Sequence, residues 1–146
     1  MSVSVKVTKR TKSVLVGISR SLSAHRCAIR DALHEHGNDV IEENQKLIIN
    51  GPKTGRIYRF RGRPHQASAP GEPPANRSGV LKDSGGYRVR NPHEMTVGEE
   101  AFYAGFLEDG TRKMKPRPHL IRAINNTAQD LINSILENVN KEVKRI

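Results

Sequence analysis

Valine alternates with polar residues near the start of the chain, over residues 3–8. A period of two is typical of a strand with one buried face, so we expect a first strand here. The next apolar segment, residues 13–19, contains Gly17. Because glycine weakens both regular structures, this segment fits either a second strand or a linker.

Residues 21–49 have a helical pattern, which Ser21 or Ser23 would cap. Apolar side chains recur at steps of seven or four, with two alanines beside them: Leu22, Ile29, Leu33, Val40, Leu47, Ala28 and Ala32. Asn50-Gly51-Pro52 predicts the helix end, because glycine adopts positive φ and proline cannot continue a helix. Gly37 lies inside the pattern, and we expect it to kink or divide the helix.

Residues 53–63 predict a strand. Tyr58 and Phe60 would face the core, and three basic side chains would face the other side: Arg59, Arg61 and Arg63. The strand leads into an extended Pro/Gly-rich loop at 62–79. Residues 64–79 alone contain four prolines and two glycines. A loop this long without packed elements is usually functional, or becomes ordered only against a partner.

Two further strands are expected at 80–90 and 99–107, with a possible bulge at Ser84-Gly85-Gly86 and with turns at Asn91-Pro92 and 108–111. The last segment predicts a helix of about seven turns, because one apolar stripe recurs at steps of three or four. Its members are Leu120, Ile124, Ala128, Leu131, Ile135, Val139, Val143 and Ile146.

This order of elements predicts a single α+β domain over residues 1–146. We expect a mostly antiparallel sheet of about four strands, with a long helix after the first strand region. The long C-terminal helix would pack on one face of that sheet. An amphipathic helix of this length needs a surface on which to bury its stripe, either the sheet or a neighbouring subunit.

Composition and charge point to partners. Apolar residues make up 35% of the chain and there is no tryptophan, so the core is thin and oligomerisation is a usual remedy. The net charge of +10 is uneven: residues 1–30 hold seven bases and no acid, 31–52 one base and five acids, 53–91 nine bases and two acids, and 92–146 eight of each. Such asymmetry indicates partners with complementary faces, either acidic proteins or nucleic acid.

The search for enzyme chemistry finds little. His34 and His36 are two apart, so on a helix they point away from each other and are expected to be exposed. Residues 51–55 lack the spacing of a phosphate-binding loop, and Cys27 is expected to be a small buried hydrophobe. Glu99 and Glu100 would lie on opposite faces of a strand, and Glu108 and Asp109 would form a turn or pair with Arg112 or Lys113. We therefore expect no enzyme activity, no cofactor and no metal.

The sequence has neither the apolar core of a signal peptide nor an apolar run that could cross a bilayer. With Cys27 as the only cysteine, no internal disulfide can form. We therefore expect a chain that folds in a cytoplasm and has no membrane partner.

Two stretches resemble a known family. The first runs from residues 53–56 (KTGR) through 67–75 (ASAPGEPPA) to 78–81 (SGVL), and the second from 103–111 (YAGFLEDGT) to 114–118 (MKPRP). Their order and spacing are similar to the tail-component family of long-tailed bacteriophages, which includes minor tail and tail-completion proteins. Family members have S-A-P-G-E-x-P-A before T-G-x-L, and Y-A-x-x-x-E-x-G-T before arginine, proline and a final helix. Ser78, Asp109 and His119 depart from the residues usual in the family.

The resemblance implies a ring, commonly of six subunits, in the virion tail or at the head–tail junction, assembled in the host cytoplasm. The implied partners are copies of the chain itself, the tail tube or tail terminator, and head-connector proteins. Proline-rich loops dock at small ordering cost because their φ angles are preset, and this favours four loop residues as ring contacts: Pro70, Glu72, Pro73 and Pro74. Arg117, held between two prolines, is expected to reach an acidic residue of a neighbour.

The basic strand allows three interpretations: contact with acidic neighbouring rings, contact with DNA in the ring lumen, or solvated surface. Six copies of Arg59, Arg61 and Arg63 would present about 18 charges, similar to about 30 Å of duplex DNA. The alternative function is a basic nucleic-acid-binding domain, although few aromatic residues are interleaved with the bases. A third hypothesis is a small metal-dependent nuclease that uses the scattered histidines.

Overall fold

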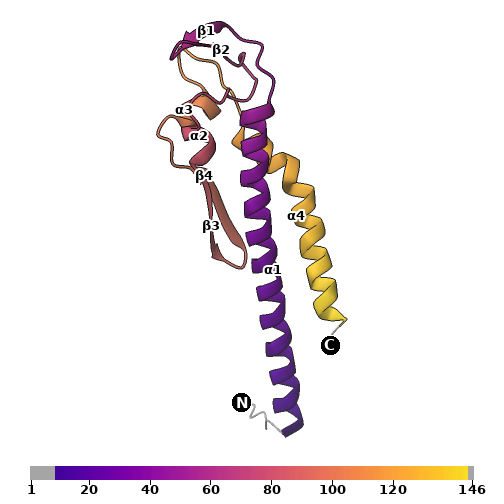
Figure 1. Cartoon of the computed structure of the whole chain (residues 1–146). Coiled ribbons are helices and arrows are strands. Elements are labelled where there is room, and N and C mark those ends of the chain that lie inside the picture. Colours follow the sequence, from indigo (N-terminus) through magenta and orange to yellow (C-terminus); the bar gives the residue numbers. More distant parts are fainter. Residues whose placement is uncertain (1–8, 145–146) are drawn as a thin grey trace.

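A computed structural model describes the backbone of residues 9–144 and the side chains of residues 22–144 except Glu142. The molecule is elongated, and its axis is one helix of 42 residues, α1 (Lys9–Asn50) (Figure 1). At a rise of 1.5 Å per residue, α1 is about 63 Å long. The remaining elements are β1 (Ile57–Phe60), β2 (Arg63–Gln66), α2 (Val80–Asp83), β3 (Gly85–Asn91), β4 (Glu94–Glu99), α3 (Ala104–Asp109) and α4 (Leu120–Val143).

All other parts of the fold are arranged around α1. α4 runs antiparallel along one side of α1, and the β3–β4 hairpin lies along another side (Figure 1). The β1–β2 hairpin, α2 and α3 gather around the C-terminal end of α1. The α+β class is confirmed. The described elements do not form a sheet of about four strands: they form two separate antiparallel pairs, β1–β2 and β3–β4.

The strand predictions failed where short helices form instead. Val80–Asp83 is the helix α2, which follows Gly79 with its left-handed φ of 84°. The strand expected at 99–107 does not form. Glu99 is the last residue of β4, and residues 104–109 form the helix α3. The hairpin turn at Asn91-Pro92 is confirmed, and the irregularity in β3 lies between Val89 and Asn91 instead of at 84–86. The two hairpins therefore do not join into one sheet, and the β3–β4 hairpin packs on α1.

The first long helix begins earlier than its pattern suggested. Residues 13–19, expected to be a strand or a linker, lie inside α1. The strand expected at 3–8 lies outside the described residues. The predicted end is confirmed at Asn50. There the N–H of Gly51 donates to the carbonyl of Leu47 (2.9 Å), and Pro52 has no N–H to continue the helix.

Gly37 neither kinks nor divides α1. It is the point where the β3–β4 hairpin approaches the helix most closely, since a Cβ built on Gly37 would lie 2.4–2.7 Å from three ring carbons of Tyr87. His34, one turn earlier, contacts the same ring edge-on, with 5.9 Å between ring centroids. The glycine therefore makes room for an aromatic side chain.

Replacing Gly37 with alanine should destabilise the fold by about 1–3 kcal/mol, because the Tyr87 ring must move. This loss should exceed the gain of about 1 kcal/mol in helix propensity. Urea unfolding measures the change. Gly105→Ala, in α3, is the matched control, because a Cβ at Gly105 meets nothing within 4 Å. A Gly37→Ala variant as stable as the unaltered chain would contradict this packing.

The proline-rich loop is packed, contrary to prediction. Its first residues belong to β2, and the remainder folds over the end of α1, where Pro73 lies against Gly51. Ser68, Pro73 and Pro74 are buried. The N–H of Gly71 also donates to the carbonyl of Pro116 (2.9 Å), which joins the loop to the segment before α4.

The core is as thin as the composition indicated. Among the described residues, the buried hydrophobic side chains are Ala32, Leu33, Val40, Ile48, Leu81, Ala104 and Ala123. The cluster at the loop end consists of Ile48, Leu81 and Ala104, with Ala101, Tyr103 and Leu107 packed against it. The predicted C-terminal helix is confirmed as α4 (Leu120–Val143), but it packs on α1 and not on one face of a sheet as predicted. Small and polar residues supply much of the seam between α1 and its neighbours, including His36, Asn44 and Thr127.

Candidate assembly interface

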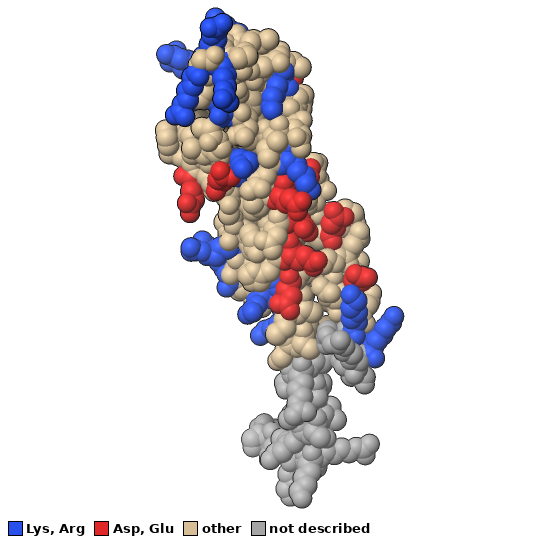
Figure 2. All heavy atoms as spheres, viewed as in Figure 1, with Lys and Arg blue, Asp and Glu red and all other residues tan. Residues whose placement is uncertain are grey.

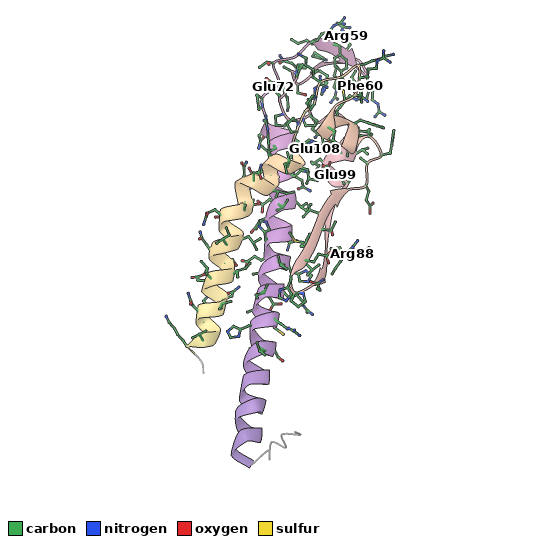
Figure 3. The ribbon with its side chains drawn as sticks, turned by 180° about the vertical axis from the view of Figure 1, so that it is seen from behind. Arg59, Phe60, Glu72, Arg88, Glu99 and Glu108 are labelled. Carbon is green, nitrogen blue, oxygen red and sulfur yellow. The ribbon has the colours of Figure 1, made fainter. Side chains whose placement is uncertain are left out.

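The β1–β2 hairpin forms a basic tip at one end of the molecule. We define the basic tip by five exposed arginines: Arg56, Arg59, Arg61, Arg63 and Arg77. Figure 2 shows basic side chains gathered at this end, and Figure 3 labels Arg59 there. None of the five forms an ion pair with a described residue. Their charges therefore remain available to a partner.

The three predicted arginines do not share one strand. Arg59 lies in β1, Arg61 is in the turn, and Arg63 opens β2, paired with Phe60. The chain reverses at Arg61-Gly62, where both φ angles are positive (50° and 80°). A two-residue turn of this kind strongly favours Asn or Gly. An arginine at such a position costs about 1 kcal/mol or more, a type of strain often found at functional sites.

Phe60 organises part of the tip. The guanidinium carbon of Arg77 lies 4.4 Å from the centre of the Phe60 ring, and that of Arg61 lies 5.4 Å away. Cations are attracted to the face of an aromatic ring, so Phe60 helps to fix the positions of the two guanidinium groups. Phe60, predicted to face the core, is half-buried and is not part of the hydrophobic cluster. The sequence prediction missed Arg56 and Arg77, for which the only signal was the basic block at 53–91.

Most of the predicted loop contacts are used inside the subunit. Pro70 is exposed, but Pro73 and Pro74 are buried. The Glu72 carboxylate accepts hydrogen bonds from the hydroxyl and N–H of Thr54 and from the N–H of Ala69. These hydrogen bonds, foremost that of the Thr54 hydroxyl, lower the pKa of Glu72. Of these four loop residues, only Pro70 is exposed, while Glu72 is half-buried.

Large apolar side chains are exposed on several elements of the molecule. Phe102, just before α3, is 88% exposed, although its ring edge contacts Tyr103. Other large apolar side chains that are exposed lie on several elements: Ile57, Val80, Phe106, Ile121, Ile132, Leu136 and Val143. On α4, Ile121, Ile132 and Leu136 lie outside the predicted apolar stripe, so this helix also exposes apolar side chains beyond the stripe. Exposed apolar surface of this kind is available to a partner.

An acidic band lies below the tip. Asp31, Glu35, Asp39 and Glu42 follow one another at steps of four, four and three along α1 and are all exposed. Such steps place side chains on one face of a helix. Figure 2 shows acidic side chains in a band along the middle of the molecule, separate from the basic end. The molecule therefore carries complementary charges on different regions of its length.

A buried ionic group joins α4 to the rest of the chain. The His119 side chain is 0% exposed and lies between two carboxylates. Its Nε2 is 2.8 Å from Oε2 of Glu99, and its Nδ1 is 2.9 Å from Oε2 of Glu108. Asn44 of α1 donates to the other oxygen of Glu99 (2.8 Å). Figure 3 shows Glu99 and Glu108 at the junction of the hairpin, α3 and α4.

Glu108 also caps α4. Its carboxylate accepts hydrogen bonds from the N–H groups of His119, Leu120 and Ile121, and a carboxylate is favourable at a helix N-terminus. The prediction that Glu108 would serve a local turn or pair with Arg112 or Lys113 is wrong. The true partners lie 11–13 residues away, and Glu108 reaches them because α3 and α4 meet at this point.

Two buried histidines have pKa values shifted in opposite directions. For His36, burial lowers the pKa below its ordinary 6.5, against the raising effect of Asp39 and Asp130. For His119, burial also lowers the pKa, but the hydrogen bond and charge of Glu99, the carbonyl of Arg117 and the charge of Glu108 together raise it above 6.5. His36 is therefore favoured as the neutral form and His119 as the cation.

These shifts predict how stability depends on pH. Above pH 6.5 the unfolded chain loses the His119 proton that the folded chain retains, so this stabilising contribution declines as pH rises through the raised pKa. Below pH 6.5 the unfolded chain protonates His36 more readily than the folded chain does, which lowers stability as pH falls. Urea unfolding at several pH values should show both declines. A His119→Ala variant that keeps the decline on the alkaline side would contradict the assignment.

Two residues considered in the search for enzyme chemistry do not lie as predicted. His36 is buried and not exposed as predicted, whereas Cys27 is exposed and not buried. Glu99 and His119 are enclosed, with side chains 3% and 0% exposed, so a substrate cannot reach them in this structure. Among the described side chains, those of residues 22–144 except Glu142, no group of three or more His, Cys, Asp and Glu is arranged to hold a metal ion. None of the described helices is long and apolar enough to cross a membrane.

The chain matches no family model, no curated protein and no solved structure.

Proposed function

We propose that this chain is a structural assembly subunit of a long-tailed bacteriophage. It forms a ring, with six copies expected, that completes the tail or joins it to the head connector, and it has no enzyme activity. The observation that carries the proposal is the excess of exposed apolar side chains, led by Phe102 at 88% exposure, on a subunit with a thin core. Neighbouring subunits would cover those side chains. The resemblance of residues 53–118 to the tail-component family supplies the phage context.

The shape and charge of the subunit support a ring. Its basic tip and acidic band lie on different regions of an elongated body (Figure 2). When such unlike surfaces meet head to tail, the contact repeats from copy to copy and closes into a ring if the rotation allows it. The same basic tip would also suit an acidic surface of an adjoining ring.

The tip suits a protein partner better than DNA. Proteins that bind single-stranded nucleic acid present aromatic rings on which bases stack. Here Tyr58 is half-buried with its ring edge against His65 (5.3 Å between centroids), and Phe60 lies under the guanidinium of Arg77. Neither ring is free as a stacking platform.

Nucleic-acid binding remains the second candidate, favoured by the five unpaired arginines of the tip. A gel shift of the purified protein with duplex DNA over a salt series separates the two. Tight, steeply salt-dependent binding of DNA by single subunits would favour the nucleic-acid-binding function.

An assembly reaction tests the first proposal. Heads and tails isolated without this subunit should remain separate or incomplete, and addition of the purified protein should produce complete particles, visible by electron microscopy. A protein that neither forms rings nor restores particles would overturn the proposal.

A further inference from the structure

A cavity of about 240 Å³ lies at the base of the basic tip. Residues of β1, β2, the proline-rich loop, α2 and α3 line it, and the end of α1 contributes Ile48. Ligand sites for whole small molecules are commonly about 300–1,000 Å³. This cavity is therefore of a size for one amino-acid side chain with its charged group and is small for a nucleotide.

The polar part of the cavity is cationic. Arg77 and Arg117 both line it, together with His65, and no Asp or Glu does. The Nε of Arg117 is buried and has no hydrogen-bond partner among the described residues. The charge of Glu72 acts on Arg117, as the lowered pKa of Glu72 reflects, but its carboxylate is not the missing partner of Nε. Its oxygens accept hydrogen bonds from Thr54 and Ala69, and it forms no ion pair with Arg117. A buried guanidinium nitrogen without an acceptor is costly, and an anion entering the cavity would supply one.

The other part of the cavity is apolar. Ile48, Leu81, Leu107 and the ring of Tyr103 line it, and they belong to the buried cluster or pack directly on it. A free phosphate or a DNA backbone would gain nothing from this lining. A ligand with an apolar side chain beside its anionic group would use both parts.

We infer that this cavity binds a carboxylate of a peptide segment in which an acidic residue lies next to an aliphatic or aromatic one, supplied by an adjoining protein. The carboxylate pairs with Arg117 and Arg77, and the apolar side chain occupies the space beside Leu81, Leu107 and Tyr103. The identity of that protein as another component of the tail or neck rests on the proposed function. The chemistry of the cavity does not depend on it.

Binding can be followed by methyl NMR of the full chain, which suits a monomer or a ring. The signals of Ile48, Leu81 and Leu107 report on the cavity. Three probes distinguish the contributions of the cationic and the apolar parts of the cavity. N-acetyl-leucine carries a carboxylate and an apolar side chain, N-acetyl-leucinamide lacks the charge, and inorganic phosphate lacks the apolar group. We expect N-acetyl-leucine to shift these signals saturably with a Kd on the order of millimolar. The amide should bind at least about tenfold more weakly, and phosphate should leave the apolar signals in place.

Arg117→Gln should weaken N-acetyl-leucine binding by about tenfold or more, and Arg77→Gln likewise. Arg77 is exposed, so its variant keeps the test valid if Arg117→Gln fails to fold. Arg88→Gln, exposed on β3 and outside the cavity, is the matched control and should bind normally. Equal binding of acid and amide, equal shifts with phosphate, or unchanged binding in both arginine variants would overturn the inference. A chain that forms rings but shows no carboxylate binding would overturn this inference and leave the proposed function standing.

Discussion

Replacing His119 with alanine is expected to lower the free energy of unfolding by about 3–5 kcal/mol, as is usual when one partner of a buried ionic group is removed. The substitution would leave Glu99, whose side chain is 3% exposed, without its cationic partner. The negative charges of Glu99 and Glu108 would then no longer have the His119 cation between them. It would also open a cavity at a position with no solvent exposure. Urea unfolding below pH 6.5 should show the loss most clearly, because the contribution of protonated His119 is fully present there.

His93→Ala is the matched control, because His93 lies exposed in the β3–β4 turn. It should change stability by less than about 0.5 kcal/mol. If His119→Ala lost less than about 1 kcal/mol, the Glu99–His119–Glu108 group would not be the junction that holds α4 in place.

Reversing the charge of the tip is expected to prevent ring formation. In the triple variant Arg59→Glu, Arg61→Glu and Arg63→Glu, each subunit would present three acids where it now presents three bases. All three side chains are exposed, so the subunit should still fold. An attractive contact would become a repulsive one, and we expect association to weaken by at least about a hundredfold, because close charge pairs across an interface couple by several kcal/mol. Sedimentation velocity measures the change.

The matched control reverses three exposed bases away from the tip: Arg88 and Arg90 on β3, and Lys141 near the end of α4. It has the same net charge as the tip variant, so a general charge effect would appear in both. If rings form equally well in the two variants, the basic tip is not part of the interface between subunits.

The long helices could be predicted from the sequence because their signals are local. α4 repeats its apolar stripe over several turns, and α1 ends where Asn50-Gly51-Pro52 requires it. The first turns of α1 were missed because residues 13–19 lack a decisive period. On α1, the prediction that Cys27 is buried and His36 exposed failed because the buried face is shared by α4 and the hairpin. Small and polar residues such as Gly37 and Asn44 line that face.

The basic tip could be predicted only in part. The run of arginines gave its charge, but the turn at Arg61-Gly62 places those charges on two strands and a turn. Arg77 reaches the tip through Phe60, 17 residues earlier in the sequence. No pattern within a short window could show that contact.

The ionic junction had no sequence signal. Glu99 and His119 are 20 residues apart, and Asn44 is 55 residues from Glu99. Only the packing of α1, β4, α3 and α4 brings these side chains together. The cavity at the base of the tip has the same origin, because its lining residues come from segments between Ile48 and Arg117.

We expect the chain to self-associate through its exposed apolar and arginine side chains, and the mass of the species present in a solution of the purified protein tests this most directly. Native mass spectrometry at micromolar concentration should find a closed oligomer of the 16.3 kDa subunit, with six copies expected. A single 16.3 kDa species at every concentration up to about 100 µM would contradict it.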